Sequence, residues 1–245
     1  MNGLSKTCLI AVQLVLASAH AALATPSPAI VISDHIIGTA ADSFFVIRTT
    51  TLNPPIYYAY HRRLEFVELS ASDGSILKKC MLRETEYVSD AGVAPETWTQ
   101  TETQKPACEV FDMLSTQSAG YITPRSTGPG AFRLTAGGLE AREETSDGSV
   151  TWATVMSATE IGARAAKTTS IPATDIPWQT GAGSSGVLSL VGTTGDDQPL
   201  HEACKLDPVP VTSRGHERMY VRLLCWSGDD DADGANFYVA LDIRQ

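Results

Sequence analysis

Two runs near the end of the sequence alternate between apolar and polar residues, and together they predict a long β-hairpin. Residues 218–226 and 236–243 each place an apolar side chain at every second position. A period of two over this length is typical of a strand with one face on a core. The residues expected to share the inward face are Met219, Val221, Leu223, Cys225, Phe237, Val239, Leu241 and Ile243. Arg222 should then point outward, and residues 227–235, rich in Asp and Gly, should form the connecting loop.

Shorter runs of β-branched, aromatic and other apolar residues, bounded by turn-forming residues, predict further strands. These runs cover residues 30–37, 43–50, 63–70, 76–82, 139–145, 150–156 and 187–191. Residues 44–47 leave no polar face, so we expect that strand to be buried on both sides. Pro54 and Pro55 should interrupt the sheet, because each removes a backbone donor.

The sequence Ser-Asp-Gly-Ser occurs twice, at residues 72–75 and 146–149, each time between two predicted strands. Asp-Gly favours a hairpin turn because these residues tolerate positive φ angles. The recurrence has two interpretations: an internal repeat, as in propeller blades, or two independent uses of a good turn. The flanking strands match poorly, which favours the second interpretation.

The predicted elements indicate an all-β fold with minor short helices. Residues 107–114 and 159–167 predict two brief helices, and neither shows a sustained apolar stripe. Residues 168–186 and 201–215 contain prolines that predict irregular connections. Many short strands separated by turns fit an antiparallel sandwich, a barrel or a small propeller-like domain equally well.

The N-terminal segment has the pattern of a signal peptide. Lys6 precedes an apolar run that is too short to span a bilayer, and small residues follow it. Residues 1–24 are therefore expected to be removed by cleavage after Ala24. Residues 25–245 would remain as a single exported β domain, periplasmic or secreted, with no transmembrane segment.

The net charge of the chain limits the classes of partner that it is expected to bind. The formal net charge is −10, and cleavage after Ala24 would remove Lys6 but no acidic residue. An acidic chain repels phosphate backbones and anionic membrane surfaces, so we expect no nucleic-acid partner. A protein ligand, a carbohydrate ligand or a divalent cation remains compatible with this charge.

Four cysteines follow the predicted signal peptide, and an even number in an exported chain predicts two disulfides. They are Cys80, Cys108, Cys204 and Cys225. Of the three possible pairings, nearness in sequence favours the first with the second and the third with the fourth. The alternative is a zinc site that combines the second pair with His201 and His216, although the closely spaced ligand pairs usual in zinc sites are missing.

One aromatic and basic cluster, at residues 56–63, is a candidate ligand-binding site. Its candidate side chains are Tyr57, Tyr58, Tyr60, Arg62 and Arg63. Aromatic faces with cationic groups beside them suit sugars or anionic ligands. The alternative is a tyrosine-rich edge strand whose arginines neutralise nearby carboxylates, and the frequency of aromatic residues in strands favours it.

Asp229, Asp231 and Asp233, followed by a glycine, resemble the first half of the calcium loop of EF-hands. An EF-hand would have a bidentate glutamate where this chain has Ala240, and similar loops of integrin-type propellers have a carboxylate where it has Phe237. The resemblance implies calcium as a possible ligand of the three aspartates. The alternative is a solvated acidic loop, and no other cofactor is expected.

The sequence favours a binding function over catalysis. Residues 181–186 match G-x-G-x-x-G, but no strand precedes them and no helix follows, as dinucleotide binding requires. The spacing of the histidines, serines and acidic residues does not single out a catalytic set. We therefore predict a non-catalytic binding or envelope-interaction module. The alternatives are a secreted hydrolase whose site is assembled from distant loops, and a calcium-stabilised structural domain.

Overall fold

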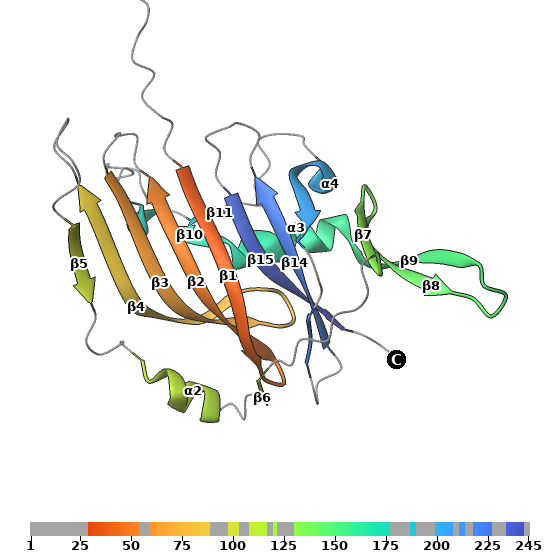
Figure 1. The fold of residues 1–245 in the computed structure, drawn as a ribbon, viewed down its shortest axis with the longest axis horizontal. Coiled ribbons are helices and arrows are strands. Elements are labelled where there is room, and N and C mark those ends of the chain that lie inside the picture. Colours follow the sequence, from red (N-terminus) through yellow and green to blue (C-terminus); the bar gives the residue numbers. More distant parts are fainter. Residues whose placement is uncertain are drawn as a thin grey trace, which may run out of the picture.

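The computed structural model describes residues 29–53, 59–88, 98–102, 108–116, 120–121, 130–176, 187–189, 199–207, 211–213, 218–226 and 234–242. The predicted signal peptide lies outside these ranges. Within them the fold is all-β with a few short helices, as predicted (Figure 1). No helix in the described ranges is long and apolar enough to cross a membrane.

The largest sheet in the described ranges has ten strands, of which eight follow the order β12-β14-β15-β1-β2-β3-β4-β5. The bounds of its strands are β1 (Ala29–Thr39), β2 (Ser43–Asn53), β3 (Ala59–Ser70), β4 (Ile76–Val88), β5 (Trp98–Glu102), β6 (Gly120–Tyr121), β12 (Cys204–Leu206), β13 (Val211–Thr212), β14 (Arg218–Trp226) and β15 (Gly234–Asp242). Neighbouring strands are antiparallel except β1 and β15, which run parallel. The first and last long strands of the chain therefore meet in the middle of this sheet.

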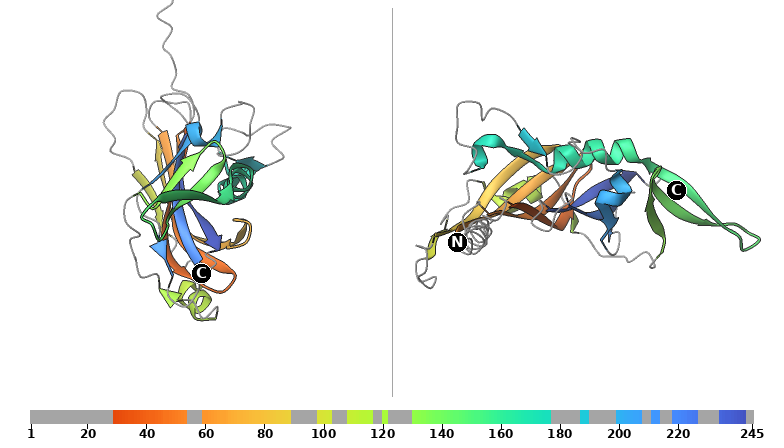
Figure 2. Two further views of the ribbon diagram at one scale, coloured as in Figure 1. Left: turned by 90° about the vertical axis from the view of Figure 1, so that its right-hand side faces the viewer. Right: turned by 90° about the horizontal axis from the view of Figure 1, so that it is seen from above.

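A second, three-stranded antiparallel sheet lies at one end of the molecule (Figures 1 and 2). It consists of β7 (Phe132–Thr135), β8 (Gly138–Glu144) and β9 (Val150–Ser157). The hairpin formed by β8 and β9 extends away from the main sheet in both figures. This sheet is joined directly to the main helix of the fold, because α3 (Ala158–Thr168) begins where β9 ends.

Helix α3 lies along one face of the main sheet and holds the parts of the fold together (Figure 2). Its buried residues Ile161, Ala165 and Thr168 lie four and three positions apart, so they form one stripe. The stripe is short and mixed, with one isoleucine, one alanine and one threonine, so it is not the sustained apolar stripe whose absence the sequence analysis noted. Arg164 on the same helix donates to the backbone oxygens of Ala71, at 3.1 Å, and Ala240, at 3.0 Å.

Short helices and strands occur in two segments that were expected to be irregular connections. Residues 168–186 contain β10 (Ser170–Pro172) and the 3-10 helix η1 (Ala173–Asp175), and β10 pairs with β11 (Val187–Ser189). The connection after residue 200 contains β12, β13 and α4 (Leu200–Ala203). Proline is accommodated because these are short edge strands, where a missing backbone donor costs little. The other predicted helix is present as α2 (Val110–Thr116).

The C-terminal hairpin is present in the predicted register, but both of its faces are buried. Val221, Leu223, Val239 and Leu241 share one face and pack in a core cluster with α3, which confirms the predicted inward face. On the other face Tyr220, Tyr238 and Ala240 pack in a second cluster with apolar residues of β1, β2 and β3. Of the three predicted architectures, the fold is closest to a sandwich, because α3 covers one face of the main sheet and the base of the small sheet packs into the same core cluster.

Arg222 lies on this second face opposite Tyr238 and is not a free surface residue. Its Nε lies 2.9 Å from Oδ2 of Asp207. Its guanidinium carbon lies 5.8 Å from the ring centroid of Tyr238. The prediction that Arg222 simply points outward was therefore incomplete, because its side chain contacts Tyr238 and Asp207.

Both disulfides favoured by nearness in sequence are present, between Cys80 and Cys108 and between Cys204 and Cys225. The first joins β4 to the segment before α2, and the second joins directly opposite residues of β12 and β14. In the entropic account, each loop closure stabilises the fold by roughly 3–4 kcal/mol. The proposed zinc site is excluded, because its two thiols are consumed in a disulfide.

The two Ser-Asp-Gly-Ser segments form similar turns in different settings. Gly74 and Gly148 have φ angles of 75° and 80°, and the aspartate before each accepts a hydrogen bond from the following serine amide. The first turn lies against α3, where Thr168 donates to the carbonyl oxygen of Gly74 at 2.9 Å. The second is exposed at the tip of the β8–β9 hairpin. The first turn joins two strands of the main sheet, and the second joins two strands of the small sheet. This difference agrees with independent use of one favourable turn.

Candidate functional site

The predicted aromatic and basic cluster is divided between different parts of the fold. Tyr57 and Tyr58 lie outside the described residues, and Tyr60 pairs with Tyr87 across β3 and β4. Arg62 and Arg63 are successive residues of β3, so their side chains lie on opposite faces of the sheet. The two arginines therefore do not contribute to one surface.

Arg63 joins a network of charges on the face that α3 covers. Its Nε donates to Oε1 of Glu84 at 2.9 Å, and its Nη1 donates to the backbone oxygen of Asp175 at 3.1 Å. Lys79 donates to the carboxylate of Asp175 at 3.0 Å, and Nε2 of His61 lies 2.6 Å from Oε1 of Glu84. Burial alone would raise the pKa of Glu84, but the hydrogen bond from Arg63 and the charge of His61 outweigh it and lower that pKa.

Next to this network lies a buried ion pair. Arg48 donates from Nε and Nη2 to the two carboxylate oxygens of Asp34, both at 2.8 Å. The exposed fractions of the two side chains are 4% and 0%. Burial acts to lower the pKa of Arg48, but the pairing with Asp34 outweighs it and raises that pKa. Glu65, also buried, lies opposite Arg48 on β3.

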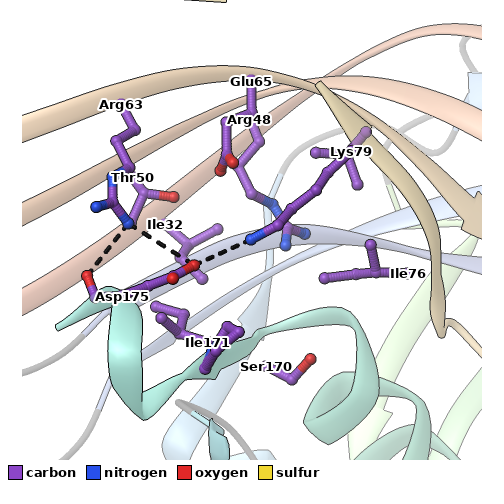
Figure 3. A pocket seen from close by; sticks show the side chains of 12 residues that line it. Ile32, Arg48, Thr50, Arg63, Glu65, Ile76, Lys79, Ser170, Ile171 and Asp175 are labelled. Atoms are coloured by element: carbon purple, nitrogen blue, oxygen red, sulfur yellow. Dashed lines mark hydrogen bonds and ion pairs between the residues drawn. The ribbon is translucent and has the colours of Figure 1, made fainter. Parts of the chain in front are cut away.

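The space among these charges is small (Figure 3). A cavity of about 20 Å³ lies between the sheet and the β10–η1 segment, and Arg63 and Lys79 converge there on Asp175. That volume is enough for about one water molecule. Arg63 and Lys79 both bind Asp175, so they fasten the β10–η1 segment to the sheet.

Arg62 lines a shallow hollow on the opposite face of the sheet. Leu64, Arg83 and Thr85 complete it, and its volume is about 130 Å³. The hollow is open, on an exposed part of the sheet surface.

The predicted calcium loop lies outside the described residues, since β14 ends at Trp226 and β15 begins at Gly234. Among the residues that the structure describes, no group of three or more His, Cys, Asp or Glu side chains is arranged to hold a metal ion. The calcium hypothesis for Asp229, Asp231 and Asp233 therefore stays a prediction.

Strand β9 is an unpaired edge with an unusual composition. Within the described residues it pairs with β8 and with no other strand. Its eight residues include no charged residue, no proline and no glycine. Val150 and Val155 are 43% and 46% exposed. Edge strands of natural proteins usually carry charges or prolines that prevent pairing with other chains, and β9 has neither.

A β-bulge limits the regular part of this edge to residues 150–154. Leu139 pairs with Met156, whereas the next residue of β8 pairs with Thr154, so Val155 is the extra residue of the bulge. Bulges also discourage pairing with other chains. Here the bulge lies next to α3, and the outer part of the strand stays regular.

The hydrogen-bond pattern shows which backbone groups of β9 face outward. The amide of Thr145 donates to the oxygen of Ser149 at 2.9 Å, which fixes the alternation of bonded pairs along the hairpin. The amide of Arg142 donates to Ala131, away from β9, as this alternation requires. It follows that Thr151 and Ala153 bond to β8. The residues whose N–H and C=O groups point to the free edge are Val150, Trp152 and Thr154.

Arg133 of β7 contacts side chains of both other strands of the small sheet. Its guanidinium carbon lies 4.2 Å from the ring centroid of Trp152, and its Nε lies 2.6 Å from Oε2 of Glu140. A cation over an indole ring stabilises the pair by about 0.5–1 kcal/mol at an exposed site. The central side chain of the edge is thus positioned without a partner protein.

The edge was not among the sites predicted from the sequence, although residues 150–156 were predicted to form a strand. Two signals in the sequence pointed toward it: the run of uncharged residues at 148–159, and the Asp-Gly turn at its start. Whether such a strand lies at an edge depends on the tertiary fold.

The chain matches no family model, no curated protein and no solved structure.

Proposed function

We propose that the protein is an exported, disulfide-stabilised β domain that binds a protein partner by adding a strand to the free edge of β9. The observation that carries this proposal is the uncharged, exposed edge at residues 150–154 on a hairpin that extends from the body. In strand addition, backbone hydrogen bonds supply affinity and pockets for alternate side chains supply specificity. The proposal thus assigns the binding function predicted from the sequence to this edge.

The outward groups of Val150, Trp152 and Thr154 can bond with an incoming strand. Each backbone hydrogen bond contributes a net stabilisation of about 0.5–1.5 kcal/mol. The pairing also covers Val150, which is 43% exposed. A hairpin protruding into water is only marginally stable by itself, and an added strand stabilises it.

The two disulfides support the proposed location, because disulfides persist in oxidising compartments outside the cytoplasm. The signal peptide predicted for residues 1–24 would supply the route.

A peptide library displayed on phage tests the proposal while the partner is still unidentified. Selection on the wild-type protein should yield extended peptides with β-branched and aromatic residues. Val150→Pro should weaken their binding about tenfold or more, because it removes an outward N–H and adds a bulky ring at the edge. The matched control Val150→Thr keeps the N–H and should bind them normally.

Val150 is the first residue of β9, a position where a strand tolerates proline, so the variant should fold. Equal thermal unfolding of the two variants would establish this. Selected peptides that bind Val150→Pro as well as Val150→Thr would contradict the proposal, as would a selection that yields no binders.

A further inference from the structure

We propose that the strand added to β9 belongs to a second copy of this chain, paired antiparallel across a two-fold axis at Trp152. This inference rests on the proposed function and names the partner of the same edge. In the resulting dimer the two small sheets would form one continuous sheet of six strands. The evidence is the charge, the hydrogen-bond pattern and the side-chain sizes along β9.

The lack of charge on β9 removes an obstacle to pairing between two copies of this chain. The chain has a formal net charge of −10, so two copies repel each other over most of their surface. β9 is free of charge over its whole length, whereas its neighbour β8 contains Glu140, Glu143 and Glu144. The nearest carboxylates lie one strand back, where Glu144 and Glu140 of β8 pair with Val150 and Thr154. Two copies that approach edge to edge therefore bring no charged side chain of β9 into the pairing itself.

The outward backbone groups are symmetric about Trp152. With an axis at this residue, Trp152 pairs with itself, and Val150 pairs with Thr154 of the second copy. Each of these pairs exchanges two backbone hydrogen bonds, so every outward group in residues 150–154 is satisfied. An isologous contact of this kind closes on itself and does not propagate into a fibre.

The side chains fit the same register. Val150 and Thr154 are both β-branched and would lie side by side, as such residues do in stable cross-strand pairs. On the other face Thr151 would lie opposite Ala153, and both are small. The position of the hairpin at one end of the molecule leaves its free edge open to an approaching copy (Figure 2).

The contact is small, and the dimer should be weak. A pairing of five residues buries less than the roughly 1,600 Å² of a standard interface. We expect a dissociation constant between about 10⁻⁵ and about 10⁻³ M. Sedimentation should therefore show the average molecular mass approaching twice the monomer value as the concentration rises through this range.

A cysteine pair tests the register itself. In a hydrogen-bonded antiparallel pair the Cα atoms lie about 5.5 Å apart, which suits a disulfide. Val150→Cys protein mixed with Thr154→Cys protein should form covalent dimers under mild oxidation. Either variant alone should form few, because its two copies of the cysteine would lie about 14 Å apart. Mapping the native disulfides by mass spectrometry checks that the added thiol has not disturbed them.

Three outcomes separate this inference from the proposed function. Covalent dimers in the mixture, together with a concentration-dependent mass that Val150→Pro abolishes and Val150→Thr keeps, support the second copy as partner. A wild-type protein that remains monomeric at about 10⁻³ M overturns it. If that monomer still binds library peptides in a Val150→Pro-sensitive manner, the proposed function stands with another protein as partner, and if it does not, both fail.

Discussion

The ion pair between Asp34 and Arg48 gives the sharpest test of the interior. Asp34→Leu would leave the guanidinium of Arg48 buried, with 4% of its side chain exposed, and without the carboxylate that accepts two of its hydrogen bonds. Arginine does not lose its charge in proteins, so it cannot escape by deprotonation. Removing one partner of a buried pair costs about 3–5 kcal/mol. Urea unfolding at neutral pH should show this loss in the free energy of unfolding.

A double-mutant cycle isolates the interaction between the two side chains. Arg48→Met alone and the double variant Asp34→Leu/Arg48→Met complete it. Replacing both charges by apolar residues is often close to neutral, although Glu65 also loses its cationic neighbour here. We expect the double variant to be more stable than the sum of the single losses predicts, by about 2–3 kcal/mol. Losses that add within about 0.5 kcal/mol would refute the description of this pair as buried and coupled.

Three further predictions test the core, the turns and the acidic loop. Leu223→Ala should cost about 2–5 kcal/mol of unfolding free energy, and a loss below about 1 kcal/mol would contradict its place in the core. Gly74→Ala should destabilise more than Gly148→Ala, although both have positive φ. At Gly74 an added Cβ would meet the backbone oxygen of Arg164 at 2.9 Å, whereas at Gly148 nothing lies within 4 Å; equal melting temperatures would contradict this. If calcium binds the acidic loop, it should raise the melting temperature by a few degrees where magnesium does not, and Asp231→Ala should abolish the difference.

Local pattern predicted much of the fold. The two-residue period placed the C-terminal hairpin and its inward face, and nearness in sequence identified both disulfides. The period did not reveal that the hairpin is buried on its second face. Tyr220 and Tyr238 have polar hydroxyls and lie on the same face as Arg222, so the sequence of that face is typical of an exposed surface.

Long-range contacts account for what the sequence analysis missed. Arg63 donates to the backbone of Asp175, which lies 112 residues away, so no local pattern indicates that this arginine faces the interior. Helix α3 buries Ile161, Ala165 and Thr168, a stripe too small to recognise without the sheet beneath it. The free edge of β9 is likewise a property of the sheet and not of the strand.

Residue-resolved hydrogen exchange tests the central claim most directly. At low concentration the amides of Thr151 and Ala153, bonded to β8, should exchange slowly, while those of Val150, Trp152 and Thr154 exchange quickly. When the concentration rises into the dimer range, or when a selected peptide is added, protection should appear at Val150, Trp152 and Thr154 and change little elsewhere in the small sheet. Outward amides that are already protected in the dilute protein, or that gain no protection under either condition, would contradict strand addition at β9.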